Sequence, residues 1–195
     1  MAEAATHPRS QTASAPRDLA MVAVFAALIA VLSITAAIPL PVGVPITLQT
    51  LGVILAGLTL GAWRGALANV LYIVVGLVGL PVFAGGTAGV AVLAKPSIGY
   101  LLSYPLAALA AGAMVTVFTK VLGRNRQIIA LVLGGLVGLV VIHVAGIIGM
   151  ALVLGLTPGA AILADLPFVP GDLIKLVLSV LIARTVHKAF PRLFR

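Results

Sequence analysis

Two ionisable side chains, Asp172 and Lys175, interrupt a long apolar stretch near the C-terminal end of the sequence. Residues three apart lie on one face of a helix, so this spacing places a carboxylate beside an ammonium group. The carboxylate accepts hydrogen bonds from ligand N–H groups, and the ammonium pairs with a carboxylate or carbonyl group. Together they suit a small solute that carries both kinds of group. Two simpler roles are open: Asp172 follows Pro170 and Gly171 and could cap a helix, and Lys175 could reach lipid headgroups.

Six further polar or aromatic residues in or beside the apolar segments are candidates for the same site: Thr47, Gln49, Phe83, Tyr100, Lys95 and Asn69. Gln49 and Asn69 could instead join helices through hydrogen bonds. Phe83 and Tyr100 either wall the apolar part of a ligand or belong to the aromatic belt at the membrane surface. Lys95 could bind an anion, or it could anchor a loop at the headgroups.

His143 lies in the middle of an apolar segment. An ionisable side chain within a membrane span is costly, so it is a functional hypothesis by default. A role in moving a proton or binding a ligand is one interpretation. The simpler interpretation is a buried histidine that satisfies a backbone carbonyl or contacts a neighbouring helix.

The composition calls for hydrocarbon rather than water around these residues. Hydrophobic residues make up 62% of the 195 residues and charged residues only 8%, and the mean hydropathy is +1.27. A soluble domain carries about 25% charged residues. Six apolar segments have the length and the flanking residues of membrane helices: 19–38, 46–62, 65–80, 97–119, 127–156 and 172–186. We therefore expect an all-α membrane protein with six transmembrane helices.

Ten of the twelve Lys and Arg residues fall on one side of these six segments. Basic residues favour the cytoplasmic side, so both termini are expected to be cytoplasmic. The net charge of +8 therefore indicates orientation in a lipid bilayer and not binding to nucleic acid. Residues 1–17 are expected to form a disordered cytoplasmic tail, residues 18–190 the six-helix transmembrane domain, and residues 191–195 a basic cytoplasmic tail.

The three connections on the opposite, outer side are long and rich in Pro and Gly. They cover residues 39–45, 81–96 and 157–171. Glycine lets a backbone approach a ligand closely, and long loops without secondary structure often act as lids. Ligand chemistry is therefore expected at the outer face.

The first predicted helix carries four alanines in two pairs with i, i+4 spacing: Ala23 with Ala27, and Ala26 with Ala30. Small residues at this spacing let two membrane helices approach closely. The face could dock a partner protein, or it could serve ordinary packing within the chain.

The inventory of reactive groups argues against an enzyme. The sequence has no cysteine, no glutamate after Glu3 and no H-E-x-x-H motif. Hydrolysis and group transfer need clustered acids, bases or metal ligands, so we expect no metal site and no cofactor. A P-loop motif is also absent, so the chain does not bind ATP in that way. A stand-alone ion-coupled permease for a small vitamin-like solute is the alternative, with His143 as its candidate proton relay.

Four stretches resemble the BioY family, the biotin-specific substrate-binding (S) components of energy-coupling factor (ECF) transporters. They are V-P-I-T-L-Q-T at 44–50, G-L-P-V-F-A-G-G at 79–86, K-P-S-I-G-Y at 95–100 and P-G-D-L-I-K at 170–175. The third is similar to the family's Gly-Pro-Thr-Gly-Gly-Tyr element but departs from it at three positions, including Lys95 in place of the first glycine. The resemblance extends over residues 19–186, and the Pro-Gly-Asp-x-x-Lys element is its most specific part.

The resemblance implies a six-helix S component in the bacterial cytoplasmic membrane, with high-affinity binding and uptake of biotin. In this family the Asp and Lys of the Pro-Gly-Asp-x-x-Lys element take part in biotin binding, and they match Asp172 and Lys175. The implied partners are a transmembrane coupling protein of the EcfT type and two ATPase subunits of the EcfA type. The alanine face of the first helix would be the docking surface for the coupling protein.

Overall fold

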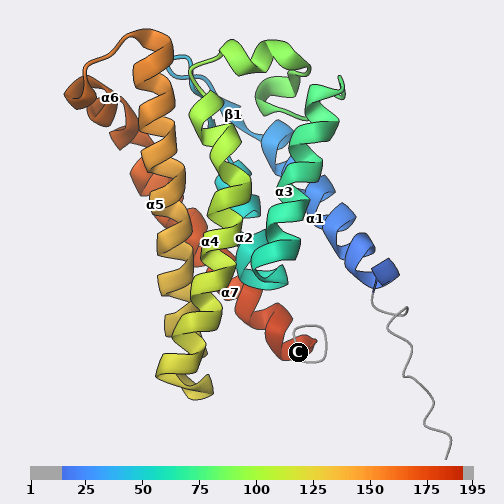
Figure 1. Cartoon of the computed structure of the whole chain (residues 1–195). Helices are drawn as coiled ribbons and strands as arrows, with labels where there is room; N and C mark the ends of the chain where they lie inside the picture. Colours follow the sequence, from blue (N-terminus) through green and yellow to red (C-terminus); the bar gives the residue numbers. More distant parts are fainter. Residues whose placement is uncertain (1–14, 191–195) are drawn as a thin grey trace, which may run out of the picture.

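Helices make up most of the chain that the computed structural model describes, residues 15–190. Most run along the length of one bundle (Figure 1). The α-helices are α1 (Ala15–Thr35), α2 (Gln49–Leu60), α3 (Ala62–Leu77), α4 (Ile98–Leu122), α5 (Gln127–Leu154), α6 (Pro158–Asp165) and α7 (Val169–Ala189). A two-stranded antiparallel pair, β1 (Ala37–Ile38) and β2 (Ile46–Thr47), joins α1 to α2.

Four helical segments are long and apolar enough to cross a membrane. They are α1, α4, α5 and the continuous helical stretch Pro158–Ala189 that contains α6 and α7. The expectation of a multi-pass, all-α membrane protein is therefore confirmed. The helices α2 and α3 have only 12 and 16 residues, which is below the roughly 20 that a full crossing needs.

The short helix α2 lies at the centre of the bundle. All of its twelve residues are buried, and it packs against α1, α3, α4, α5 and α7. Its ends therefore meet protein and not lipid, which is the condition under which a broken helix is tolerated at membrane depth. A sharp turn at Gly61, whose φ is +82°, reverses the chain into α3. A side chain would be strained at that φ, so the turn depends on glycine.

Several predicted boundaries were wrong. The second helix was expected over 46–62, but Ile46 and Thr47 belong to β2, where they pair with Ile38 and Ala37. The first helix was expected to reach residue 38 and instead ends at Thr35. Hydrophobicity alone does not separate a short buried strand from helix, and that caused both errors.

The outer connections contain more structure than predicted. Residues 84–86 and 90–94 form 3-10 turns, labelled η2 and η3. Residues 157–171 were expected to be a loop but hold α6, the 3-10 turn η5 (Leu166–Phe168) and the start of α7. The Thr157 side chain caps α6 by accepting from the Ala160 N–H, and Pro158 occupies its first turn. Proline starts a helix as readily as it ends one. Pro158 therefore begins α6 here, where a loop is expected from the sequence.

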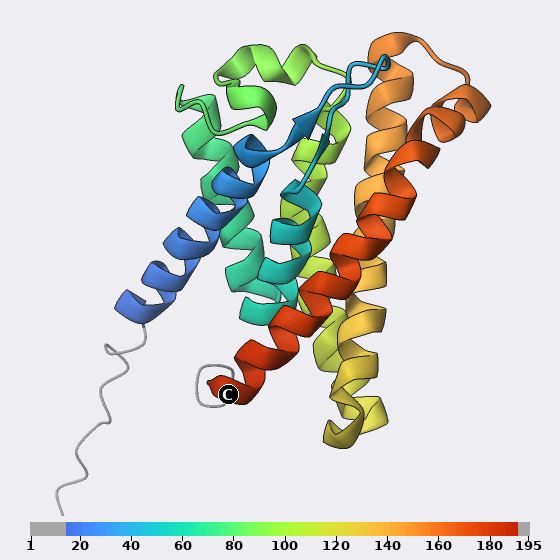
Figure 2. The ribbon, with the colours of Figure 1, turned by 180° about the vertical axis from the view of Figure 1, so that it is seen from behind.

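The two ends of the bundle differ. One, the loop end, carries β1 and β2, the connection from α3 to α4, and the α5–α6 connection (Figures 1 and 2). The other, the basic end, carries the start of α1, the α2–α3 and α4–α5 turns and the end of α7. Arg64, Lys120, Arg126 and Lys188 lie in the helix ends and turns of the basic end. The bundle thus has the charge asymmetry that the sequence predicts.

The predicted tails lie mostly outside the described residues. This applies to residues 1–14 and to the whole basic tail 191–195. The boundary at residue 17 was wrong, because α1 already begins at Ala15.

Candidate ligand-binding site

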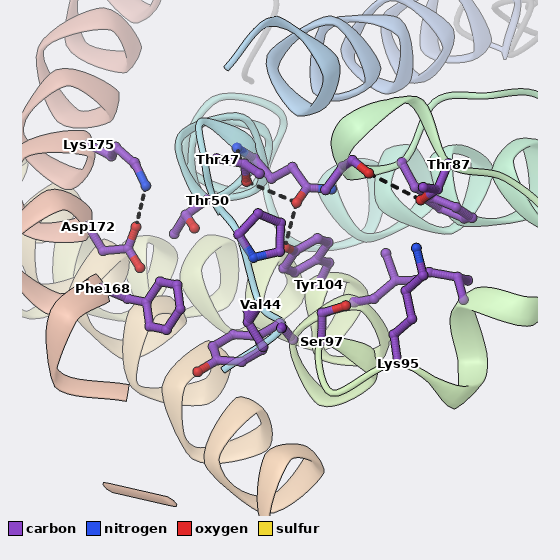
Figure 3. Close-up of a pocket in the computed structure, with 18 residues that line it drawn as sticks. Val44, Thr47, Thr50, Thr87, Lys95, Ser97, Tyr104, Phe168, Asp172 and Lys175 are labelled. Carbon is purple, nitrogen blue, oxygen red and sulfur yellow. Dashed lines mark hydrogen bonds and ion pairs between the residues drawn. The ribbon is translucent and has the colours of Figure 1, made fainter. Parts of the chain in front are cut away.

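A pocket of about 100 Å³ lies beneath the segments of the loop end. Part of its lining comes from the β1–β2 connection and the start of α2. The rest comes from the α3–α4 connection, α4 and the region of α7. Its walls are Gly43, Val44, Pro45, Thr47, Gln49, Thr50, Phe83, Ala84, Thr87, Val92, Lys95, Ser97, Tyr100, Leu101, Tyr104, Phe168, Asp172 and Lys175. Figure 3 shows Asp172 and Lys175 on one side and Thr87 and Lys95 on the other.

Asp172 and Lys175 form a buried ion pair on the pocket side of α7. Lys175 Nζ lies 2.7 Å from Asp172 Oδ1, and the side chains are 9% and 6% exposed (Figure 3). The predicted juxtaposition on one helical face is therefore present. Because the two charges compensate each other, the pair presents a donor and an acceptor to the pocket with no net charge.

Gln49, the first residue of α2, is held by hydrogen bonds at both ends of its amide. Its Oε1 accepts from Thr47 Oγ1 at 3.0 Å and from Tyr104 Oη at 3.3 Å. Its Nε2 donates to Tyr72 Oη at 2.6 Å, and Tyr72 Oη lies 3.2 Å from Ser33 Oγ. This network ties α1, α2, α3 and α4 together, so it fixes the polar floor of the pocket before any ligand arrives.

Aromatic rings supply the apolar walls. The Phe83 ring meets Tyr72 edge to face with 5.6 Å between centroids, and Phe83 is 2% exposed. On the other side, the rings of Tyr100 and Phe168 lie 5.9 Å apart. The Tyr100 ring fits against Gly146 of α5, where a Cβ would clash with it. These rings give room for an apolar body between the polar groups.

Lys95 is half-buried at the start of the last turn before α4 and lines the pocket. No ion pair involves it within the part of the chain that the structure describes. Its charge is therefore available to a ligand anion, in contrast to that of Lys175.

Seven of the eight predicted site residues line this one pocket: Thr47, Gln49, Phe83, Lys95, Tyr100, Asp172 and Lys175. Asn69 does not. It is fully buried in α3, where its Nδ2 donates to the Gly65 carbonyl at 2.9 Å. Asn69 lies in the middle of α3 and outside the pocket lining, so the structure does not bring it to this site.

Other lining residues were not among the predicted set. Phe168 and Thr50 carry no distinctive spacing, and only the fold brings them to the pocket. Asp165 was also missed, although it is a carboxylate within an apolar stretch. The rule that makes each such ionisable residue a hypothesis could have found it. It lies outside the pocket lining, next to His143.

The predicted alanine face of α1 is only partly exposed. Ala23 and Ala27 are exposed, and Ala30 is intermediate. Ala26 is 6% exposed and belongs to the core, so its assignment to a docking face was wrong. The four positions share one helix face, and Ala26 lies at the edge of that face that turns toward the core.

The chemistry of this site is that of binding. The pocket combines amide, hydroxyl, carboxylate and ammonium groups around aromatic walls. Within residues 15–190, no group of three or more His, Cys, Asp or Glu side chains is arranged to hold a metal ion. The arrangement suits a small molecule with an N–H and C=O pair, an apolar body and an anionic group.

Comparison with known proteins gives a consistent picture. The model of the BioY family matches residues 5–192. The biotin transporter BioY of Rhodobacter capsulatus is 41% identical over 90% of this chain and 95% of its own. That of Rhizobium etli is 37% identical over 91% and 96%. Because these relatives are named as transporters, the expectation that the chain is not an enzyme is confirmed.

The fold also matches a solved structure, the S-component for biotin from an ECF-type ABC transporter. The TM-score is 0.81 at 28% sequence identity, and the match covers 92% of this chain and 95% of the other. The family model, the relatives and the solved structure point to one and the same family. The chain therefore belongs to the BioY family.

Proposed function

We propose that the protein binds biotin in the pocket of the loop end and serves its uptake as the S component of an ECF-type transporter. The observation that carries this proposal is the buried Asp172–Lys175 pair, which lines the pocket of the loop end in a chain of the BioY family. The names of the relatives and of the structural match support the choice of biotin.

Biotin has a ureido ring, an apolar thiophane ring and a chain that ends in a carboxylate. The ureido group presents N–H and C=O side by side, and it suits a neutral donor–acceptor pair. Asp172 accepts from the ureido N–H, and Lys175 donates to the ureido carbonyl. The aromatic walls around Phe83 and Tyr100 contact the thiophane ring.

Lys95 takes the carboxylate end in this orientation. Lys175 is already compensated by Asp172, whereas Lys95 lies across the pocket without an ion pair among the described residues (Figure 3). Thr47, Thr87 and Ser97 add hydroxyl groups along the pocket. Gln49 holds Thr47 and Tyr104 in place.

We also propose that the chain crosses the cytoplasmic membrane six times, with both ends in the cytoplasm. The basic end then faces the cytoplasm and the loop end faces outside, in line with the bias of Lys and Arg. The partners are a coupling protein of the EcfT type and two ATPases of the EcfA type. Ala23 and Ala27 of α1 form the docking face, and energy comes from the ATPases because this sequence has no P-loop motif.

Titration of detergent-purified protein with biotin tests the site. Asp172→Asn and Lys175→Met should each weaken binding by at least about tenfold, because each leaves the other group without its partner. The double variant leaves neither charge unpaired. If it folds but still fails to bind biotin, the loss of binding does not come from misfolding. Asp18→Asn is the matched control, since Asp18 pairs with Arg64 at the basic end at 2.9 Å. Unchanged affinity in both single variants would refute the site.

A further inference from the structure

A second cluster of ionisable side chains lies behind the ligand pocket, where α5, α6 and α7 meet. His143 Nδ1 is 2.8 Å from Asp165 Oδ2, and His143 Nε2 is 3.4 Å from Asp172 Oδ2. Asp172 lines the pocket, but His143 and Asp165 do not. The cluster thus links a carboxylate that faces the ligand to one that the ligand does not touch.

These groups are shielded from water. The side chains of Asp165 and Asp172 are 5% and 6% exposed, and that of His143 is 16% exposed. His143 and Asp165 border a separate hollow of about 340 Å³ that opens on the outside of the bundle and whose other walls are aliphatic: Leu136, Leu139, Val140, Val144, Ile147, Val169 and Leu173. In such surroundings an uncompensated charge is costly and acts strongly on its neighbours.

The charges of the cluster balance only when His143 carries a proton on each ring nitrogen. Asp165 and Asp172 contribute two negative charges, and Lys175 contributes one positive charge. Both ring nitrogens face carboxylate oxygens, and both can donate only in the imidazolium form. Tyr100 Oη, which donates to Asp165 Oδ1 at 2.5 Å, adds a hydrogen bond without adding charge.

We propose that His143 is a positioning residue that holds Asp172 and links the binding of an anionic ligand to its own proton. Asp165 holds the imidazole ring from α6. Loss of the proton leaves a net negative cluster behind the Asp172 side of the pocket, and this charge repels the ligand carboxylate across the poorly screened interior of the bundle. A ligand of the same shape without that charge escapes the repulsion. The inference rests on the proposed function, because it takes the ligand to be the biotin anion.

The test compares biotin with its neutral analogue biotinamide on the full-length protein in detergent. His143→Asn should weaken biotin binding at least about tenfold and biotinamide binding several-fold less. Adding Asp165→Asn removes the excess negative charge, so the double variant should recover most of the affinity for biotin. In the unaltered protein, biotin affinity should fall as pH rises, and His143→Asn should flatten that dependence.

The outcomes separate the possible failures. Equal losses for both ligands in His143→Asn, with no recovery in the double variant, would overturn the proposal in favour of packing alone. If His143→Asn does not fold, Asp165→Asn alone decides: it leaves no net negative charge when His143 is neutral, so the fall in biotin affinity with rising pH should become smaller, and an unchanged profile overturns the proposal. Asp18→Asn should change neither ligand. An unaltered protein that binds neither ligand refutes the proposed function instead.

Discussion

The ionic and amide side chains of the pocket are each engaged before a ligand arrives, with one exception. Asp172 and Lys175 compensate each other, and Gln49 uses both ends of its amide. Such preorganisation lowers the entropy that binding must overcome. Lys95 is the exception, since no ion pair holds it within the described residues.

Lys95→Met should weaken biotin binding about three- to tenfold, because a half-buried ammonium contributes less than a fully buried one. Binding of biotinamide should change little, since that ligand has no carboxylate for Lys95 to pair with. Calorimetric titration with both ligands measures the difference. Lys120→Met, in the last turn of α4 at the basic end, is the control. Equal losses of affinity for biotin and biotinamide would show that Lys95 does not pair with the biotin carboxylate.

At the scale of elements, glycines set how closely α4 and α5 approach at the loop end. A Cβ at Gly149 would lie 2.6 Å from the Gly99 backbone, and a Cβ at Gly99 would clash with the Ala145 carbonyl. Close approach of this kind is how membrane helices associate without a hydrophobic driving force. It also brings Tyr100, at the start of α4, against Gly146 and within reach of Asp165.

Gly149→Val should separate these helices and cost about 1–3 kcal/mol, as overpacking does. At about 2–4 °C per kcal/mol for a chain of this size, the apparent melting temperature in detergent should fall by several degrees. Gly159→Val is the matched control, because nothing lies within 4 Å of a Cβ at that position. A melting temperature unaffected by Gly149→Val would contradict the close contact.

At the scale of the whole molecule, α1 is the least enclosed of the long helices. Only 22% of the apolar 18-residue stretch of α1 is buried, compared with 39% of the corresponding stretch in each of the other three long segments. Its exposed side includes Ala23 and Ala27, while Ala26 and Ile29 face the core. An S component needs a lipid-facing surface that a membrane partner can cover. Of the long helices, α1 leaves the largest fraction of its apolar stretch exposed.

Ala23→Trp or Ala27→Trp should reduce co-purification of the coupling protein and the ATPases while leaving biotin binding by the isolated chain intact. A bulky side chain holds two helices apart where small residues let them meet. Leu106→Trp, at a position that is 62% exposed on α4, controls for the added bulk. If the coupling protein and the ATPases still co-purify with both alanine variants, α1 is not the docking helix.

Local patterns were enough to predict the membrane class, the basic end and the Asp172–Lys175 pair. Hydropathy, charge bias and i, i+3 spacing each act within a few turns of chain, so they can be read without the fold. Most of the predicted site residues also line the pocket, because they lie at the segment ends near Thr47, Phe83 and Tyr100.

Long-range packing decided the rest. Whether Asn69 faces a ligand or the core depends on how α3 rotates against its neighbours, and the helical period alone does not set that rotation. The meeting of His143, Asp165 and Asp172 requires α5, α6 and α7 to converge, over sequence separations that no local pattern spans. The sequence by itself determined which groups exist and which lie on one helix face. Only the tertiary structure decided which carboxylates lie against the same imidazole ring, because that depends on distances between helices.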